Sequence, residues 1–320
     1  MDVIGVGDID VDIFLEVDRI PSRDEKILAN SVNLYPGGMV ANFIVALSRL
    51  GTPCGFHGPV GSDEYGEIAI KDLKDNKVDT SYLVVKEGKK TYFCVVMLDE
   101  SGEKALIVAP TECLVLKEED ILTEAIKSAK HMHTTFHGSA QAKAIQIAHD
   151  SGLTISVDFE PDSVKNGSCL NDLLAKIDIA FINRNALKLM SRFDDLEKAA
   201  IDVKLRGPKV VCVTLGKKGA LIVKDSKSEP IKINSFNVPV VDTTGAGDCF
   251  AAGFVHGFLS GWPIDFVGRF ASATAAIKIM SIGGHTGAPN FSEVISFLIE
   301  RNIPIPDNIV EKNIQEVSND

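Results

Sequence analysis

A glycine-rich turn that ends in a carboxylate is the part of the chain with the clearest capacity for chemistry. It reads Asp242-Thr243-Thr244-Gly245-Ala246-Gly247-Asp248. The apolar residues before it predict a strand over 233 to 241, and the small residues after it predict a helix. The first turn of a helix has N–H groups without intrahelical acceptors and the positive end of the helix dipole, so this turn is expected to bind an anion such as phosphate.

Asp248 gives the anion cradle a group that can move a proton. Its carboxylate suits a general base, which removes the proton of a hydroxyl as that oxygen attacks a phosphoryl group held by the amides of residues 245 to 247. The alternative is structural, because acidic residues in the first turn commonly stabilise the start of a helix. The turn alone leaves both interpretations open.

Acidic residues at the end of the first strand form a second candidate site. Asp8, Asp10 and Asp12 recur at alternate positions, so in an extended chain they project to one side. Sugar hydroxyls or a cation would relieve the repulsion between the three carboxylates. The structural alternative is a solvated strand end.

A glycine pair precedes the helix that is expected over 39 to 50. Gly37 and Gly38 let the backbone approach a ligand closely, and Asn42 brings a donor and an acceptor to the helix start. This combination suits a polyol. An ordinary turn with an inward asparagine is the alternative.

The sequence lacks the common nucleotide-binding loops. Gly5-Val6-Gly7 follows a strand, but the third glycine of a dinucleotide fingerprint would fall at Asp10, and the P-loop pattern is absent. Thr214-Leu215-Gly216-Lys217-Lys218-Gly219-Ala220 follows a strand at 209 to 213 and is most simply a strand-turn-strand, with glycines where φ is positive. A nucleotide would therefore be bound without a P-loop.

Three histidines lie close together in the sequence. His131, His133 and His137 have no cysteine or carboxylate nearby that completes a zinc-binding set, so a metal site is disfavoured. We expect His133 and His137 instead to line the carboxyl end of their strand, where ligands of open α/β sheets bind.

Composition limits the class of protein. The 320 residues are 45% hydrophobic and 24% charged, which suits a folded α/β protein, and the net charge of −11 argues against a nucleic-acid surface. The six cysteines form no C-x-x-C pair and several lie in apolar runs, which is typical of reduced, buried thiols in a cytosolic protein. We see no secretory leader and no apolar run long enough to span a bilayer, so a cytoplasmic location is expected.

Alternating strands and helices predict a mostly parallel sheet covered on both faces. The expected strands lie at 2 to 7, 54 to 60, 131 to 136, 153 to 159, 178 to 182 and 209 to 215, and the expected helices at 39 to 50, 63 to 76, 118 to 129, 139 to 151, 195 to 206 and 291 to 301. Residues 12–36 and 88–111 carry strand patterns without an intervening helix. The second of these segments reads as a hairpin, and together they predict a small separate sheet that serves as a lid. We see no linker and expect residues 1–320 to form one domain.

These segments together resemble the ribokinase-like carbohydrate kinases, also called the PfkB family, over nearly the whole chain and in the same order. The resemblance implies an α/β three-layer sandwich with a small β lid, and ATP-dependent phosphorylation of a sugar hydroxyl with Mg²⁺. It also implies that the lid forms a homodimer interface. The Asp242 to Asp248 turn is highly specific for the family, and the Gly37-Gly38 segment is moderately so.

The resemblance also implies roles for individual residues. Asp248 corresponds to the catalytic base, and the amides of Gly245, Ala246 and Gly247 correspond to the anion hole. The sugar-binding positions of the family match Asp10, Asp12, Gly37, Gly38 and Asn42. Its nucleotide-binding positions match Asn183, Thr214, Gly216 and Gly219. Asp242 and Thr244 fall where many members hold a monovalent cation such as K⁺.

One position departs from the family pattern. The family usually has an Asn-x-x-Glu motif whose glutamate positions Mg²⁺ and phosphate, but here the stretch is Asn183-Arg184-Asn185-Ala186. Loss of that outer carboxylate should weaken metal positioning without abolishing in-line attack. We therefore expect a kinase that holds its metal by other groups, with a weakened sugar-binding regulator as the alternative.

The substrate is expected to be a small sugar without a phosphate group. Met39 in the glycine turn is apolar, and no cluster of lysine or arginine lies near the sugar-binding positions. A free ketose, a pentose or a sugar acid is favoured. A sugar phosphate or a nucleoside is the alternative.

Overall fold

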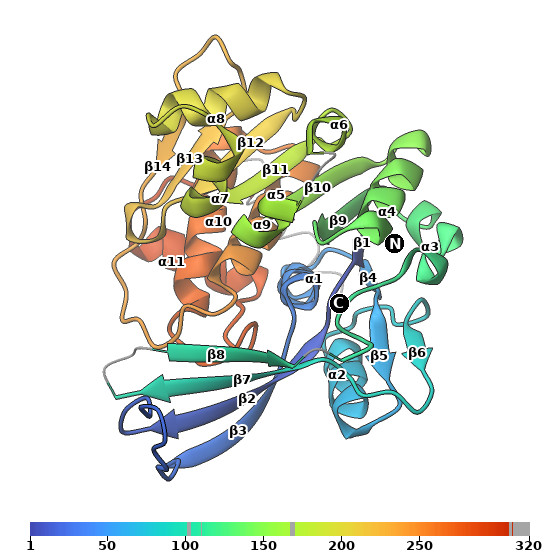
Figure 1. The fold of residues 1–320 in the computed structure, drawn as a ribbon. Helices are drawn as coiled ribbons and strands as arrows, with labels where there is room; N and C mark the ends of the chain where they lie inside the picture. Colours follow the sequence, from blue (N-terminus) through green and yellow to red (C-terminus); the bar gives the residue numbers. More distant parts are fainter. Residues whose placement is uncertain (101–103, 110, 167–169, 307–308, 310–320) are drawn as a thin grey trace.

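A central eight-stranded sheet organises the chain (Figure 1). The computed structural model describes residues 1–100, 104–109, 111–166, 170–306 and 309. The order of the strands is β14-β13-β12-β11-β10-β9-β1-β4, and the six strands from β12 to β4 pair in parallel, whereas β13 and β14 are antiparallel at one edge. Their bounds are β1 Val3–Val6, β4 Cys54–His57, β9 His131–Thr135, β10 Thr154–Phe159, β11 Ile179–Asn183, β12 Val210–Thr214, β13 Ala220–Val223 and β14 Ile231–Ile233.

Helices cover both faces of this sheet because successive strand residues point to opposite sides. In β11, Ile179 and Phe181 pack into the core that contains α1, α2, α9 and α10, whereas Ala180 and Ile182 pack into the core that contains α3, α4, α6, α7 and α8. The helices are α1 Met39–Arg49, α2 Glu64–Asp75, α3 Thr123–Lys127, α4 Ser139–Asp150, α5 Pro161–Asn166, α6 Leu170–Leu174, α7 Arg184–Met190, α8 Leu196–Leu205, α9 Ala246–Leu259, α10 Ile264–Lys278 and α11 Phe291–Glu300. The predicted three-layer α/β architecture is therefore confirmed.

A second sheet extends below the main body as a lid (Figure 1). Its strand order is β3-β2-β7-β8, with β2 Asp10–Val17, β3 Ser31–Gly37, β7 Phe93–Asp99 and β8 Lys104–Ala109. These strands come from the two segments predicted to form a separate sheet, and β7 and β8 pair as the predicted hairpin, although its turn at 101 to 103 lies outside the described residues. Two short strands, β5 Pro59–Gly61 and β6 Val84–Lys86, pair beside it.

Two predicted elements are wrong. The strand expected over 233 to 241 ends at Ile233, and an extended loop follows, because Pro239 has no N–H for a ladder and Phe236 packs on Phe297 of α11 instead. The helix expected over 118 to 129 is divided into a 3₁₀ turn, Glu118–Asp120, and α3. The strand expected over 54 to 60 is divided as well, into β4 of the main sheet and β5 of the two-stranded sheet. The remaining predicted strands and helices are present within a few residues.

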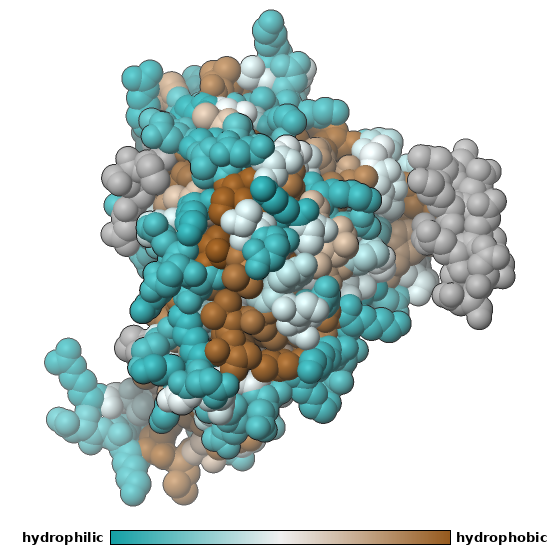
Figure 2. All heavy atoms as spheres, turned by 90° about the vertical axis from the view of Figure 1, so that its right-hand side faces the viewer, coloured by the Kyte–Doolittle hydropathy of each residue, from teal (hydrophilic) through white to brown (hydrophobic). Residues whose placement is uncertain are grey.

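The surface and the thiols agree with the composition. Seen from the side of α3, α4 and β6, the molecule is mostly hydrophilic, with one hydrophobic strip (Figure 2). Five cysteines are unpaired and buried, as expected, and Cys169 lies outside the described residues. Within the described part of the chain, every helix is too short or too polar to cross a bilayer.

Candidate active site

A cavity of about 870 Å³ lies at the carboxyl ends of the parallel strands, between the main sheet and the lid. Open α/β sheets bind their ligands at this edge. The cavity collects most of the predicted site residues: Asp10, Asp12, Gly38, Asn42, Asn183, Thr214, Thr244, Gly245, Ala246, Gly247 and Asp248. Of the remaining predicted residues, Gly37, Gly216, Gly219 and Asp242 lie outside its lining.

The anion cradle is the start of α9. Gly245 precedes the helix with φ of +73°, and a Cβ there would lie 1.8 Å from the Gly284 carbonyl oxygen, so only glycine fits. A Cβ at Gly247 would meet nothing within 4 Å and would instead point into open space in the cavity. The start of α9 therefore borders a space large enough for a phosphoryl group, although the amide of Ala246 donates to the Thr243 carbonyl oxygen at 3.2 Å.

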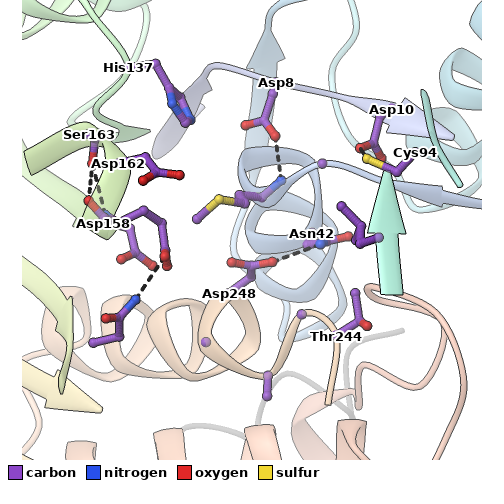
Figure 3. Close-up of a pocket in the computed structure, with 18 of the residues that line it drawn as sticks. Asp8, Asp10, Asn42, Cys94, His137, Asp158, Asp162, Ser163, Thr244 and Asp248 are labelled. Atoms are coloured by element: carbon purple, nitrogen blue, oxygen red, sulfur yellow. Dashed lines mark hydrogen bonds between the residues drawn. The ribbon is translucent and has the colours of Figure 1, made fainter. Parts of the chain in front are cut away.

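Asp248 lies in the first turn of α9, between two groups of acidic residues (Figure 3). Its side chain is 8% exposed, and its Oδ2 accepts a hydrogen bond of 2.8 Å from Asn42 Nδ2. Burial raises the pKa of Asp248 to about 7, the negative charges of Asp8 and Glu160 act in the same direction, and Asn42 opposes them. A carboxylate with this pKa accepts a proton readily near neutral pH, which suits a general base.

Asn42 is held from its other side by a buried histidine. Asn42 Oδ1 lies 2.7 Å from His285 Nδ1, and His285 Nε2 lies 2.8 Å from Asp72 Oδ2 of α2. Because an amide oxygen accepts, Nδ1 of His285 donates to Asn42 Oδ1. This chain of hydrogen bonds fixes the orientation of Asn42 and so directs its amide N–H at Asp248.

Asp10 and Asp12 face the same cavity from β2. Asp10 is 4% exposed, and its Oδ1 is buried without a hydrogen-bond partner. Burial, together with the charges of Asp12 and Asp8, raises the pKa of Asp10 well above its usual value, and burial raises the pKa of Asp12 to about 6. A buried acceptor without a donor is costly, so this site is built for a ligand that brings hydrogen-bond donors.

Asp10, Asp12 and Cys94 are close enough together to hold a metal ion. Cys94 Sγ donates to Asp10 Oδ2 at 3.6 Å, and burial followed by the charge of Asp10 raises the pKa of this thiol to about 12. A protonated thiol is a poor metal ligand. The chemistry of this group therefore does not favour a metal ion.

The other residues of the N-terminal motifs have structural roles. Asp8 also lines the cavity, but it lies before β2 and accepts from the amides of Met39 and Val40 at the start of α1. A Cβ at Gly37 would lie 2.4 Å from Asp10 Oδ1, so glycine at this position makes room for the buried carboxylates.

Two more carboxylates lie on the opposite side of Asp248, at the end of β10 (Figure 3). Asp158 is 9% exposed, and burial together with the charges of Glu160 and Asp248 raises its pKa well above the usual value. Burial also raises the pKa of Glu160, whose Oε2 accepts a hydrogen bond of 2.9 Å from Asn183 Nδ2. Sequence reasoning missed both, although one acidic residue at the end of a buried strand and another directly after it could have indicated them.

Asn183 and Ala186 lie at the start of α7. Asn183 Oδ1 accepts from the amides of Asn185 and Ala186, and Ala186 is fully buried in the core beneath the helix. A methyl group therefore occupies the position of the family glutamate. Glu160, from the neighbouring strand, is the carboxylate that contacts Asn183 instead.

The predicted nucleotide loop contributes one residue to the cavity. Thr214 lines it, whereas Gly216 and Gly219 serve the turn between β12 and β13, with φ of +57° and +82°. A Cβ at Gly219 would lie 1.9 Å from the Ile233 carbonyl oxygen. Gly216 and Gly219 therefore shape a strand-turn-strand, as the simpler interpretation of the sequence predicted.

The histidines divide between the core and the site. His137 lines the cavity as predicted. The same prediction for His133 is wrong, because this side chain points into the core, where its ring stacks on Phe43 at 3.6 Å and its Nδ1 contacts Ser156. Burial lowers the pKa of His133 well below its usual value.

Asp242 and Thr244 contact two lysines that sequence reasoning did not single out. Lys104 Nζ lies 3.2 Å from Asp242 Oδ1 and 2.7 Å from Thr244 Oγ1, and Lys278 Nζ lies 3.2 Å from the Asp242 carbonyl oxygen. Lys278 is fully buried. A lysine in an otherwise apolar stretch of helix was the available signal, but its partner is 36 residues away.

Comparison with known proteins places these observations in a family. The pattern of the pfkB family carbohydrate kinases matches residues 2–290. An ATP-dependent ribose-1-phosphate kinase from Halopiger xanaduensis is 31% identical over 300 residues, covering 93% of this chain and 98% of the relative.

Two solved structures extend the comparison to bound ligands. A protein assigned as ribokinase II from E. coli, in complex with ATP and Mg²⁺, is 27% identical with a TM-score of 0.83, over 93% of this chain and 99% of that one. The ribokinase of Arabidopsis thaliana, complexed with ribose and ATP, is 26% identical with a TM-score of 0.79, over 93% and 98%.

Proposed function

Because the chain belongs to the pfkB family of carbohydrate kinases and is itself an ATP-dependent carbohydrate kinase, we propose that it phosphorylates a hydroxyl of an uncharged sugar, with Asp248 as general base. The observation that carries the proposal is the position of Asp248. It lies at the first-turn amides of α9, between the buried acceptors Asp10 and Asp12 and the second pair of carboxylates. Sugar and triphosphate would meet at its carboxylate.

The proposed reaction is a direct in-line transfer. Asp248 takes the proton of the sugar hydroxyl, the oxygen forms a bond to the γ-phosphorus of ATP, and the bond to the β,γ-bridging oxygen breaks to release ADP. The amides of Gly245 and Gly247 donate to the negative charge on the phosphoryl oxygens, and the amide of Ala246 would join them by exchanging its bond to the Thr243 carbonyl oxygen for one to the phosphoryl group. Asn42, fixed by His285, keeps the carboxylate of Asp248 in one orientation.

The residues on the nucleotide side fit Mg²⁺. Asp158, Glu160 and Asn183 offer oxygen donors, which this hard cation prefers. Burial is the main cause of the raised pKa values of the two carboxylates and repulsion by neighbouring carboxylates adds to it, so a bound cation would stabilise their charged forms. When bound, Mg²⁺ supplies neutralisation of the triphosphate charge. We propose that Glu160 takes over the positioning role of the glutamate that Ala186 replaces.

The lining favours a substrate without a phosphate group. Neither lysine nor arginine occurs among the lining residues that the structure describes, and the sugar side carries several carboxylates. A sugar acid would be repelled there, so a ketose or pentose is favoured over the sugar acid that the sequence left open. A phosphorylated sugar is the first alternative substrate, because one relative is a ribose-1-phosphate kinase. A nucleoside is the second, because apolar Leu106 and Leu114 line the cavity and could contact a base.

The lid suggests how two copies would associate. Its strands expose apolar side chains: Val32 (63%), Leu106 (51%) and Ile107 (58%). We propose that this surface pairs with the lid of a second copy, as the resemblance implies. We further propose that residues 1–320 form a single kinase domain that works in the cytoplasm and binds neither nucleic acid nor membranes. Ile107→Asp should convert a dimer to a monomer in sedimentation velocity, whereas a wild-type chain that is monomeric would contradict the pairing.

The substrate is tested with ligands that differ in one feature. Thermal shift and ADP release are measured with ATP and Mg²⁺ and with free pentoses and ketoses, their phosphates, sugar acids and nucleosides. We expect at least one free sugar both to raise the melting temperature and to release ADP. Turnover confined to phosphorylated sugars or nucleosides would overturn the substrate class. Ligand binding without ADP release from any compound would favour the weakened regulator.

A further inference from the structure

The residue pair expected to hold a monovalent cation is already surrounded by hydrogen-bond donors. Asp242 Oδ1 accepts from the amide and the hydroxyl of Thr244 at 2.9 and 2.7 Å, and its Oδ2 accepts from the amide of Gly283 at 3.0 Å. Asp242 itself is 3% exposed. Both carboxylate oxygens of Asp242 therefore already accept hydrogen bonds from protein donors.

Lys278 brings an ammonium group to this turn from α10. Its side chain is fully buried, and its Nζ donates to the Asp242 carbonyl oxygen at 3.2 Å. Burial lowers the pKa of Lys278, and the nearby charge of Asp242 opposes that shift. A buried ammonium is costly unless it is paired, and the carbonyl oxygen and nearby negative charge of Asp242 supply that pairing.

Lys104 brings a second ammonium from the lid. It is the first residue of β8, and its Nζ contacts Asp242 Oδ1 at 3.2 Å and Thr244 Oγ1 at 2.7 Å, over a separation of about 140 residues. Burial raises the pKa of Asp242, but the bonds from Thr244 and the charges of the two lysines outweigh burial and hold that pKa below its usual value. One ionised carboxylate thus faces two ammonium groups.

A monovalent cation does not fit this arrangement. It would be a third positive charge beside a single carboxylate, and it would have to displace Lys104 or Lys278 from the oxygens they contact. The charge that such an ion would supply next to the anion cradle is present in the chain.

We propose that Lys278 and Lys104 replace the monovalent cation, so that the anion hole is held in its working conformation without potassium. Lys278 positions the Asp242–Thr244 turn through its contact with the Asp242 carbonyl oxygen. Lys104 adds its charge from the lid. Both are positioning residues, since they contact the turn and not the reacting atoms. The proposal rests on the proposed kinase reaction for its activity readout, but ion binding itself is measured on the protein alone.

The wild-type protein provides the first test. ADP release with its best sugar is measured in KCl and in tetramethylammonium chloride of equal ionic strength, and melting temperatures are measured in the same two salts without substrate. We expect equal rates and equal melting temperatures, within about 1 °C. A rate that rises severalfold in KCl, or a melting temperature that rises only with K⁺, would overturn the proposal. If no sugar supports ADP release, the kinase proposal fails, and the melting temperatures still decide the ion question.

Variants provide the second test. Lys278→Ala and Lys104→Ala should each lower kcat about 10- to 100-fold, as for groups that orient catalytic residues, with little change in KM for the sugar. In Lys278→Ala, KCl should restore part of the rate, which a purely structural role would not produce. Exposed Lys26→Ala on the lid is the matched control and should keep wild-type kcat. If both test variants retain wild-type kcat in the absence of K⁺, the proposal is wrong.

Discussion

Replacement of Asp248 by asparagine should remove activity and increase stability at the same time. The change removes the proposed base but keeps the shape of the side chain and an oxygen that can accept from Asn42 Nδ2. A base that takes the substrate proton contributes about 10²- to 10⁴-fold, so kcat should fall by about that factor. Binding of the sugar, measured by thermal shift, should persist.

The stability gain follows from the raised pKa. A shift of the pKa from 3.8 in the unfolded chain to about 7 in the folded protein is about 3 units, or on the order of 4 kcal/mol. Because the folded pKa is raised, the stability contribution of Asp248 is complete below pH 3.8 and is lost as pH rises through 7. The advantage of the variant should therefore grow by about 1.4 kcal/mol per pH unit between pH 5 and 7 and stay constant above that range.

The assay is denaturant unfolding of both proteins across this pH range, together with thermal melting at pH 8. With about 2.1 cal/mol/K per residue, 320 residues give an unfolding entropy of about 0.7 kcal/mol/K, so the variant should melt about 6 °C higher. Asp162→Asn, at a side chain that is 91% exposed in the same cavity, is the control and should change stability by less than about 0.5 kcal/mol. A variant that is less stable at pH 8, or that retains wild-type kcat, would refute the reasoning.

Three further predictions address the same site. The kcat/KM of the wild type should rise with pH through about 7 and level off above it, since Asp248 must be ionised to accept a proton; a flat profile from pH 5 to 8 would contradict this role. Gly247→Ala should keep the melting temperature but lower kcat about 10²-fold, because its methyl group fills the phosphoryl space. Gly245→Ala should instead destabilise the fold, because its Cβ would overlap the Gly284 carbonyl oxygen. Equal behaviour of the two variants would count against the cradle. Glu160→Gln should raise the Mg²⁺ concentration for half-maximal rate about 10- to 100-fold, and an unchanged Mg²⁺ requirement would exclude Glu160 from metal positioning.

Sequence reasoning succeeded where one short segment determines both geometry and chemistry. The spacing of glycines before Asp248 demands a sharp turn into a helix, so the cradle and the carboxylate could be predicted together. Alternation placed Asp10 and Asp12 on one face of a strand. The alternating strands and helices predicted a mostly parallel sheet, and the two segments with strand patterns but no intervening helix predicted the separate lid.

The residues it missed act through contacts between distant segments. His285 meets Asn42 across 243 residues, and Lys104 meets Asp242 across 138 residues. No local pattern marks such partners, because the fold brings them together only when the lid, α1 and α10 are in place. The error at His133 has a related cause: strand alternation gives the spacing of side chains but not which face meets the core.

The central claim is that a sugar hydroxyl is phosphorylated at Asp248, and ³¹P nuclear magnetic resonance tests it most directly. The protein is mixed with ATP, Mg²⁺ and the free sugar that raises its melting temperature most, and the spectrum is followed with time beside Asp248→Asn. The account predicts ADP and a new phosphomonoester in equal amounts, dependent on the sugar and formed at least about 10²-fold more slowly by the variant. Release of inorganic phosphate without a phosphomonoester, or equal rates for the two proteins, would contradict it.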